Sequence, residues 1–372
     1  MDFDLTDEQR LLADTVNGLL DKRYDANTRL KLIDSDLGWS RELWSQYAEL
    51  GLLGLTFDEQ YDGAGMGPAE LAVVMESFGR ALVLEPFLAT VVLGGSLVAE
   101  AGTPEQKAEI LPKVAAGELL LAFAFTEPDS RWSFTEIATT AKQHGDGWQL
   151  SGEKIAVLGG AAADKLIVSA RTDDGIGLFL VEADDVARAP YAMQDGLRGA
   201  DVLLSDAPAT LLGTSGDALA VIDTVIDRAT AALCAEAVGA MARMLTMTVD
   251  YLKTRVQFGQ PIAVFQALQF RSADMYVSLE QARSMALLAR LALAGDDPVE
   301  RRRLVQAAKI QVDLSGKHVS QEAIQLHGGI GMTMEYPVGH YAKRVTVISK
   351  TFADVDHLLA QVGAGGGLVH AP

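Results

Sequence analysis

Helical periodicity over the C-terminal part of the chain constrains the fold more than any other feature of the sequence. Apolar residues recur there at helical spacing over long stretches, and the connections between the stretches are short. Long amphipathic helices with short connections pack into a bundle, because each helix buries its apolar face against its neighbours. The glycine-rich end, residues 363–372, is expected to be a flexible tail. We predict a C-terminal four-helix bundle over residues 214–362, with helices at about Ala218–Arg255, Phe265–Ala294, Pro298–Leu326 and Tyr341–Val362.

The remaining residues divide into a helical zone and a zone of short strands. Residues 1–118 show helical spacing, and prolines open two of the expected helices, at Pro86–Ala101 and Pro104–Ala116. Residues 119–213 contain short apolar or alternating runs, which predict a small β domain. The expected fold class is therefore mainly α with one β domain. The expected strands are Leu119–Phe125, Trp148–Ser151, Lys165–Ala170 and Ile176–Val181.

The charge balance limits the kinds of partner that the chain can have. The 31 Lys and Arg residues against 50 Asp and Glu residues give a formal net charge of -19. A surface this acidic repels phosphate backbones and anionic lipid, which argues against a nucleic acid or a membrane surface as partner. It leaves room for a nucleotide ligand, because a few arginines and backbone amides hold phosphates locally.

Cysteine, histidine and terminal residues indicate an ordinary cytoplasmic protein. Cys234 is the one cysteine and lies in an apolar helical context, so we expect a buried, inert thiol and no disulfide within the chain. His318, His340 and His357 are expected in surface or packing roles, and no metal site is predicted. The acidic, polar N-terminus does not fit a signal peptide. Apolar stretches such as Leu119–Phe125 are too short to span a bilayer.

Two segments have compositions that do not suit a helix interior. Arg255–Ile262 stops a long helix and places an arginine, an aromatic ring and a glutamine on an inter-helix turn, where they can meet a diphosphate and a purine. Gln325–Met332 carries three glycines, which let phosphates or a ribose approach the main chain closely. Either segment alone is equally well explained as a tight turn without a ligand. The two together, in this order, indicate nucleotide binding.

The sequence resembles the acyl-CoA dehydrogenase family along nearly its whole length. Two of the matching stretches lie in the expected β domain, and the other two coincide with the turns described above. The resemblance implies a helical N-terminal domain, a middle β domain and a C-terminal four-helix bundle, assembled as a dimer of dimers. The matching stretches are Thr126-Glu127-Pro128, Gly152-Glu153-Lys154, Arg255-x-x-Phe258-Gly259-x-Pro261-Ile262-x-x-Phe265-Gln266 and Gln325-Leu326-His327-Gly328-Gly329-x-Gly331.

Two further stretches carry a narrower resemblance, to the small subunit of bacterial pimeloyl-CoA dehydrogenases. This narrower resemblance implies a medium-chain acyl-CoA as substrate, with dicarboxylic acyl chains among the candidates. It also implies a homo- or heterotetramer with an acyl-CoA dehydrogenase paralogue, while the resemblance to the family as a whole implies an electron-transfer flavoprotein as the electron acceptor. The stretches are Ala232-Leu233-Cys234-Ala235-Glu236-Ala237-Val238-Gly239 and Gly331-Met332-Thr333-Met334-Glu335-Tyr336.

The resemblance implies FAD as the cofactor. In such proteins the flavin ring lies between the β domain and the bundle of one subunit, and the neighbouring subunit holds the adenosine diphosphate end. By motif position, Thr126 would lie against the flavin of its own subunit. The residues expected to reach a neighbour's FAD are Arg255, Phe258, Gln266, Gln325 and Gly329.

The implied reaction is the α,β-dehydrogenation of an acyl-CoA thioester, in which a carboxylate removes the α-proton while a hydride leaves the β-carbon for the flavin. Phe352 stands where most of the family carries the catalytic glutamate. A minority places the base near the start of the long bundle helix, directly before an arginine, and Asp227 and Arg228 hold that position here. Asp227 is in line with an apolar stripe, so lost hydration would make it a stronger base. The alternative is an ordinary early-helix aspartate favoured by the helix dipole.

The motifs expected to face the flavin depart from the family pattern. Ala156 and Leu158 stand where the family has a tryptophan that shields the flavin ring and a threonine whose hydroxyl meets it. The residues expected to face a neighbour are intact. Two hypotheses follow: a catalytic subunit that uses Asp227, and a non-catalytic subunit that completes the FAD site of a catalytic paralogue. A third, an acyl-CoA-binding protein without redox chemistry, is disfavoured by the intact nucleotide motifs.

Overall fold

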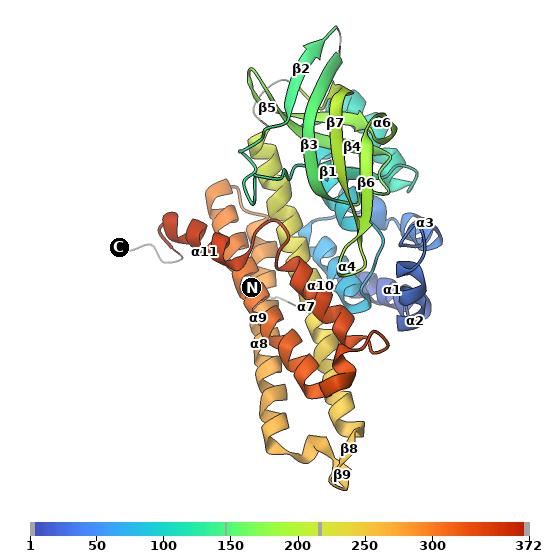
Figure 1. The fold of residues 1–372 in the computed structure, drawn as a ribbon, viewed down its shortest axis with the longest axis vertical. Coiled ribbons are helices and arrows are strands. Elements are labelled where there is room, and N and C mark those ends of the chain that lie inside the picture. Colours follow the sequence, from blue (N-terminus) through green and yellow to red (C-terminus); the bar gives the residue numbers. More distant parts are fainter. Residues whose placement is uncertain (1–3, 146, 215–217, 368–372) are drawn as a thin grey trace. The chain divides into compact units, whose positions relative to one another are not determined.

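The computed structural model describes residues 4–145, 147–214 and 218–367 (Figure 1). Contacts within the chain divide it into two compact units. We call them the helical unit and the β unit, and each draws on segments that are far apart in the sequence. The helical unit consists of Met1–Arg29, Pro68–Val83 and Thr230–Pro372, and the β unit of Leu30–Gly67 and Leu84–Ala229.

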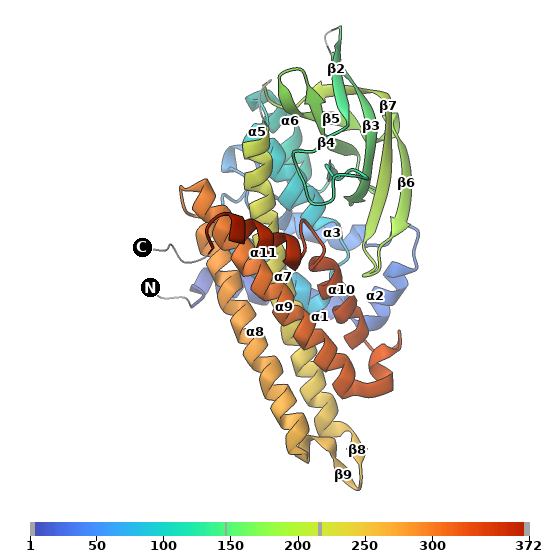
Figure 2. The same cartoon turned by 60° about the vertical axis from the view of Figure 1, so that its left-hand side comes forward.

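A seven-stranded sheet forms the centre of the β unit, and its strands curve around a shared core (Figure 2). The strand order is β1-β4-β2-β3-β7-β5, β6 pairs with β7, and β4 also pairs with β5. The pairing of β4 with β5 closes the sheet into a barrel. The four predicted strands are present, whereas β2, β6 and β7 were not predicted. The strands are β1 (Leu121–Ala124), β2 (Thr140–His144), β3 (Gly147–Leu158), β4 (Lys165–Thr172), β5 (Gly175–Glu182), β6 (Ala187–Ala192) and β7 (Arg198–Leu211).

Small and aliphatic side chains fill the barrel. Leu166, Val168 and Ala170 alternate along β4 and all belong to this core, as the period of two in a strand requires. Trp148 lies against Phe179, with ring centroids 5.2 Å apart. The core therefore follows from the alternating pattern of the strands.

Capping residues set where the helices of the β unit begin. Ser40 accepts a hydrogen bond from the Leu43 amide at the start of α3. Thr103 and Gln106 form a reciprocal capping box at the start of α6. The helix predicted from Pro86 is a π-helix, η3, followed by α5. The elements are α3 (Arg41–Glu49), η3 (Leu88–Gly95), α5 (Ser96–Ala101) and α6 (Pro104–Ala115), while α2 (Ala26–Ile33) and α7 (Leu219–Thr254) contribute to both units.

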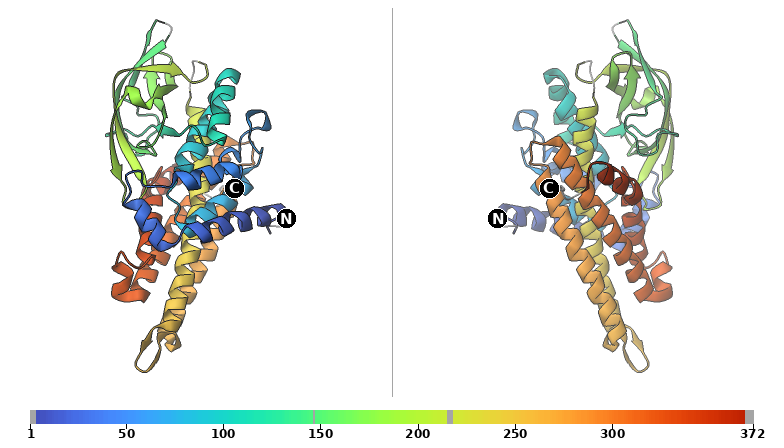
Figure 3. Two further views of the ribbon diagram at one scale, coloured as in Figure 1. Left: turned by 90° about the vertical axis from the view of Figure 1, so that its right-hand side faces the viewer. Right: turned by 90° about the vertical axis from the view of Figure 1, so that its left-hand side faces the viewer.

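Long helices build the helical unit, and Figure 3 shows α7 and α8 side by side as far as the hairpin that joins them. Arg271 on α8 donates to both carboxylate oxygens of Glu322 on α9, at 2.5 and 3.0 Å. Arg344 on α10 makes the same two-point contact with Glu236 on α7, and this pair is buried. The first three predicted bundle helices are therefore present. The remaining helices of this unit are α1 (Asp7–Arg23), α4 (Pro68–Ala81), α8 (Gln266–Ala292), α9 (Pro298–His327), α10 (Val338–Ile348) and α11 (Val355–Ala364).

The prediction of one continuous fourth helix is wrong, because the helix is interrupted between α10 and α11. Lys309 donates to the carbonyl oxygen of Ile348 at 3.0 Å and so satisfies the end of α10. Phe352 has a φ of +67°, which no helix accommodates. Asp354 then caps α11 by accepting from the His357 amide. Helix α11 includes Gly363 and Ala364, the first two residues of the predicted flexible tail, and residues 368–372 of that tail lie outside the described residues.

Helix α7 is apolar and mostly buried. An 18-residue window in it has a mean hydropathy of 1.3, enough for a candidate membrane span, but 67% of that window is buried within the protein. The core helix of a soluble protein passes the same test. Cys234 on α7 is fully buried, and burial raises the pKa of its thiol to about 12. The prediction of a buried thiol is confirmed.

Gly79 on α4 and Gly239 on α7 let these helices approach closely. A Cβ at Gly239 would lie 1.9 Å from the carbonyl oxygen of Glu76, and one at Gly79 would lie 1.9 Å from that of Glu236. Because backbone cannot give way cheaply, Gly239→Ala is expected to lower the free energy of unfolding by about 1–3 kcal/mol, measured by urea denaturation.

Gly18→Ala is the matched control for this change. Gly18 lies inside α1, and a Cβ there would meet nothing within 4 Å. Alanine is the better helix former, so this variant is expected to be more stable by about 0.5–1 kcal/mol. Equal effects of the two substitutions would contradict the close crossing of α4 and α7.

Candidate functional site

The first turn predicted to meet a nucleotide is a short hairpin. β8 (Val256–Gln257) pairs with β9 (Gln260–Pro261), and Phe258 at the tip has a φ of +54°. Arg255 and Phe258 are exposed, with 87% of the Phe258 surface accessible. The Phe258 ring meets that of Phe265 edge-on at 6.0 Å. The hairpin therefore presents a cation and an aromatic ring outward.

The second predicted turn follows the end of α9. Gly328 has a φ of +65°, and its amide bonds to the carbonyl oxygens of Ile324 and Gln325. A 3-10 helix, η6 (Gly328–Met332), comes next. A Cβ at Gly328 or at Gly329 would meet nothing within 4 Å, and Gln325 and Gly329 are exposed. The main chain is therefore open to a ligand at these two glycines.

The hairpin lies at the bottom of Figure 1 (β8 and β9), and the second turn follows the end of α9 that packs against the same end of α7. Tyr251, near the end of α7, stacks on His327, the last residue of α9, with ring centroids 4.6 Å apart. Gln266, the first residue of α8, is exposed at the same end. The structure thus brings the five residues predicted to face a neighbour to one end of a single unit.

Thr126 is placed elsewhere, in the β unit. It lies just after β1, is half-buried, and accepts a hydrogen bond from the Ile155 amide at 2.9 Å through its carbonyl oxygen. This bond ties the Thr126-Glu127-Pro128 stretch to β3.

The next residue, Glu127, forms a buried ion pair with Lys154 on β3. Nζ of Lys154 lies 2.8 Å from Oε1 of Glu127, and it also lies within 3.3 Å of the Ser169 hydroxyl. The amides of Ala138 and Thr139 donate to the same carboxylate, at 2.6 and 3.0 Å. Glu127 therefore closes the loop between β1 and β2 as well as pairing with β3.

The ion pair joins the two β-domain motifs, because Glu127 belongs to one motif and Lys154 to the other. Burial pushes the pKa of Glu127 upward, but hydrogen bonds from Lys154, Thr139 and Ala138 outweigh it, so the pKa lies below 4.5. Burial lowers the pKa of Lys154 to about 8. We did not predict a role for either residue, although both stand in the stretches that carry the family resemblance.

A bulge in β3 lies where the family pattern is lost. Ala156 has a φ of +52°, at a shift in the register between β3 and β7. Its amide donates to Asp201 at 3.0 Å, and the Tyr191 hydroxyl donates to the same carboxylate oxygen. Neither Ala156 nor Leu158 offers an aromatic wall or a hydroxyl group at this bulge.

The two candidate positions for a catalytic base differ in chemistry but not in burial. Asp227 on α7 is 2% exposed, and Phe352 is 7% exposed. Arg228, the next residue, donates to Glu100 at 2.8 Å. Asp354 caps α11, as described above. Of these two positions, only Asp227 carries a carboxylate, and this carboxylate is buried.

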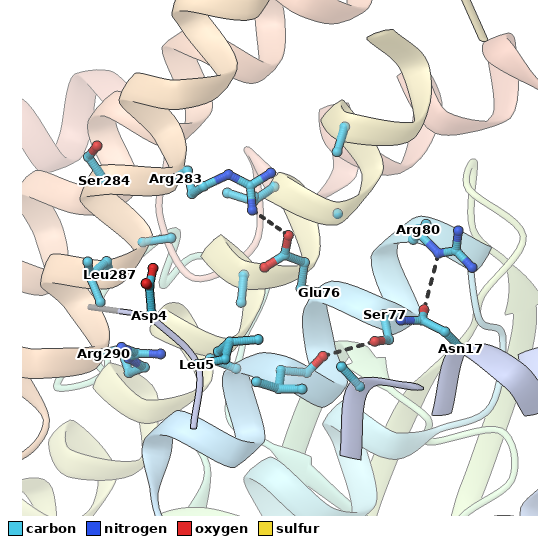
Figure 4. Close-up of a pocket in the computed structure, with 18 residues that line it drawn as sticks. Asp4, Leu5, Asn17, Glu76, Ser77, Arg80, Arg283, Ser284, Leu287 and Arg290 are labelled. Carbon is cyan, nitrogen blue, oxygen red and sulfur yellow. Dashed lines mark hydrogen bonds and ion pairs between the residues drawn. The ribbon is translucent and has the colours of Figure 1, made fainter. Parts of the chain in front are cut away.

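A further cavity of about 570 Å³ lies between α1, α4, α7 and α8 (Figure 4). Arg283 donates to Glu76 at 2.7 Å and Arg80 to Asn17 at 3.1 Å along its wall. None of the predicted site residues lines it. Within the described ranges no group of three or more His, Cys, Asp or Glu residues is arranged to hold a metal ion.

Three domain families match the chain in sequence. They are the acyl-CoA dehydrogenase N-terminal domain over residues 6–118, the middle domain over residues 122–203, and the C-terminal domain over residues 216–350. These matches follow one another along nearly the whole chain.

Individual proteins agree with these matches. The probable acyl-CoA dehydrogenase YngJ of Bacillus subtilis is 32% identical over 355 residues, which cover 91% of this chain and 92% of that protein. The ChsE4-ChsE5 complex from Mycobacterium tuberculosis has a TM-score of 0.87 at 26% identity, with 100% of both chains covered. A glutaryl-CoA dehydrogenase from Mycobacterium smegmatis in complex with FADH2 has a TM-score of 0.90 at 24% identity, with 99% of this chain and 96% of that one covered. The chain therefore belongs to the acyl-CoA dehydrogenase family, whose members are oxidoreductases that bind FAD.

Proposed function

We propose that this chain is a subunit of an FAD-dependent acyl-CoA dehydrogenase and that it holds the adenosine diphosphate end of a neighbouring subunit's FAD. The main support is the pair of outward-facing turns at one end of the helical unit. Arg255 and Phe258 stand on one turn and Gln325 and Gly329 on the other, while Gln266 begins α8. All five residues are exposed. Such an arrangement suits a ligand that arrives from outside the subunit.

Each residue suits one part of a dinucleotide. The Arg255 guanidinium can form two parallel hydrogen bonds to a diphosphate. Phe258 offers a ring face for adenine. The Gln266 and Gln325 amides both donate and accept, as hydroxyl groups and purine edges require. At Gly329 the main chain has space for an approaching phosphate or ribose.

The β unit fits the flavin ring of the cofactor less well. Thr126 is half-buried and has a hydroxyl group at the expected place. Ala156 and Leu158 supply neither the aromatic wall nor the second hydroxyl of the family pattern. The chain's own residues therefore fit the adenosine diphosphate of a neighbour's FAD better than a flavin ring of its own.

We further propose that Asp227 removes the α-proton of an acyl-CoA thioester. Bound FAD supplies the hydride acceptor of this reaction. Asp227 is 2% exposed and is the carboxylate at the position, directly before an arginine, that a minority of the family uses for the base. The side chain is one methylene shorter than the usual glutamate, so the substrate must approach it more closely.

A non-catalytic role is the second candidate, and specific residues favour it. Phe352 replaces the usual base, and Ala156 and Leu158 replace the usual flavin contacts. The related ChsE4-ChsE5 structure is a complex of two proteins. A subunit of this kind would lend its two turns to a paralogue that carries out the proton transfer.

Purification alone and with a co-expressed paralogue separates the two candidates. A yellow protein from the chain alone, which passes electrons from a medium-chain acyl-CoA to an artificial acceptor, would support the catalytic subunit. A colourless chain that acquires FAD only with the paralogue would support the second role. Absence of FAD from every assembly would contradict both.

The finer details of the activity are proposals too, and the substrate class among them rests on the narrower resemblance. We propose a medium-chain acyl-CoA, monocarboxylic or dicarboxylic, as substrate and a homo- or heterotetramer as the assembly. We also propose an electron-transfer flavoprotein as acceptor and the cytoplasm as location. Comparison of monocarboxylic and dicarboxylic thioesters of equal chain length in the same assay tests the substrate class.

Arg255→Ala is expected to weaken FAD binding by about 10- to 100-fold, because it removes a charge-assisted, two-point hydrogen bond. FAD titration of the apo-assembly followed by flavin fluorescence measures this change. Lys253→Ala is the matched control, since Lys253 is an exposed cation at the same end of α7. If the two substitutions weaken FAD binding equally, the loss of one positive charge explains both effects, and the proposed contact of Arg255 with the diphosphate is contradicted.

A further inference from the structure

Three rings meet where α7, α9 and the segment before α10 come together, and we call them the aromatic clamp. His327 stacks on Tyr251 at 4.6 Å and packs against Tyr336 at 4.8 Å. Tyr251 and Tyr336 approach each other edge-on at 6.2 Å. His327 is only 3% exposed. The clamp therefore joins three segments around one buried histidine.

Hydrogen bonds determine the tautomer of His327. Nδ1 lies 2.7 Å from the carbonyl oxygen of Ala323, which only accepts, so Nδ1 carries the proton. Nε2 of the neutral ring is then an acceptor, and the Tyr336 hydroxyl donates to it over 3.3 Å. Burial lowers the pKa of His327 below 6.5, against the opposing effect of the Ala323 carbonyl. The ring is therefore neutral at pH 7.

The aromatic clamp lies directly beside both turns. The carbonyl oxygen of Tyr251 accepts the Arg255 amide at 2.8 Å, so the hairpin begins at the clamp. Gly328 follows His327 in the chain. The main chain at Gly331 then lies close to the histidine, as shown by a Cβ built at Gly331, which would be 3.1 Å from Cβ of His327. Movement of the histidine ring would therefore disturb the Arg255 turn and the glycine turn together.

We propose that His327 is a positioning residue that fixes the Gly328–Met332 turn against the end of α7, and so sets the spacing between Arg255 and Gly329. The role in FAD binding rests on the proposed function given above. His327 is buried and acts through Tyr251 and Tyr336.

Other contacts hold the same segment from the side of α10. His340 donates from Nε2 to the carbonyl oxygen of Met334 at 2.9 Å, and the Lys343 ammonium lies 3.4 Å from the Met334 sulfur. On α7, Arg243 and Asp250 are the charged groups that act on Tyr336. The segment between η6 and α10 is thus held by α10 on one side and by α7 on the other, where the Tyr251 ring and the buried His327 ring both contact Tyr336.

Hydrogen–deuterium exchange on the apo-protein tests the inference without any cofactor. His327→Phe keeps a ring for stacking but loses both hydrogen bonds, and we expect protection of residues 328–336 to fall by about tenfold or more. Tyr336→Phe removes one hydrogen bond, so a fall of about two- to fivefold is expected, and this variant serves if His327→Phe does not fold. His318→Phe is the matched control, since His318 lies on the same helix and bonds to Ser278 instead.

The pH profile and FAD affinity complete the test. The folded protein favours the neutral His327 ring. The contribution of this ring to stability is therefore present above pH 6.5 and is lost as the pH falls through the lowered pKa of His327. Intrinsic-rate-corrected protection of the wild type should fall in that range, and that of His327→Phe should not. FAD affinity should fall in both clamp variants. Unchanged protection would overturn the inference, as would unchanged FAD affinity where Arg255→Ala weakens it. No effect of Arg255→Ala would instead refute the proposed function.

Discussion

Replacing Lys154 with methionine is expected to lower the free energy of unfolding by about 3–5 kcal/mol, because it leaves a buried carboxylate without its cation. Glu127 is 5% exposed, and its Oε1 lies 2.8 Å from Nζ of Lys154. The amides of Ala138 and Thr139 still donate to the carboxylate in this variant, but they do not neutralise it. Urea denaturation at pH 7 measures the loss.

Lys165→Met is the matched control for this prediction. Lys165 pairs with Glu182 within the same sheet, but the Glu182 side chain is 56% exposed. Exposed ion pairs contribute about 0–1 kcal/mol. The double variant Glu127→Gln/Lys154→Met should lose less than the sum of its single changes, because neither charge is left alone. A Lys154→Met variant as stable as Lys165→Met would show that the buried pair does not stabilise the barrel.

The Glu127–Lys154 pair also makes the free energy of unfolding depend on pH. The folded pKa of Glu127 lies below its ordinary value of 4.5, so its contribution is present above pH 4.5 and lost as the pH falls through the lowered value. Lys154 affects stability at alkaline pH, because its pKa in the folded protein is about 8, below the ordinary value of 10.5. Stability from Lys154 therefore rises as the pH rises from 8 toward 10.5.

Asp227→Asn is expected to lower kcat by about 10²- to 10⁴-fold, the usual contribution of a general base. The amide cannot accept the α-proton, while the size of the side chain is kept. FAD content should change little. The measurement is steady-state dehydrogenation of an acyl-CoA by the flavin-loaded assembly.

Asp356→Asn provides the control for the loss of a carboxylate. Asp356 is exposed in the first turn of α11, close in sequence to the usual position of the family's base. It is expected to leave kcat within about twofold, as for a surface group outside the site. Full activity of Asp227→Asn would remove Asp227 as the base and favour the non-catalytic subunit.

The bundle and its turns were predictable because their signals are local. Helical spacing covers α7, α8 and α9, and the change of composition at Arg255 and Gln325 marks where they end. The break between α10 and α11 was not predictable, because its residues include no glycine or proline. It depends on Lys309, a residue of another helix, which binds the end of α10.

The strands that were missed have weak or mixed patterns. Most residues of β6 are exposed, and it contains Pro190. Most of β2 is exposed and polar. In β7, small residues such as Ala207 and Ala209 fill the core where a strand pattern would have larger side chains. These strands form because neighbouring strands of the barrel supply the partners for their backbone hydrogen bonds.

The candidate site was only partly predictable. Arg255 and Gly329 could be identified from local composition and the family motifs. The pairing of Glu127 with Lys154 joins residues 27 positions apart, and the stacking of Tyr251 on His327 joins two helices. Contacts of this kind follow from the tertiary fold and have no local signal.

The most direct test of the account is an experimental structure of the complete assembly with FAD. We predict nucleotide density beside the two turns, with the diphosphate within hydrogen-bonding distance of Arg255 and the main chain near Gly329 in contact with the cofactor of an adjacent subunit. Turns that face bulk water, with every FAD enclosed by a single subunit, would contradict the account.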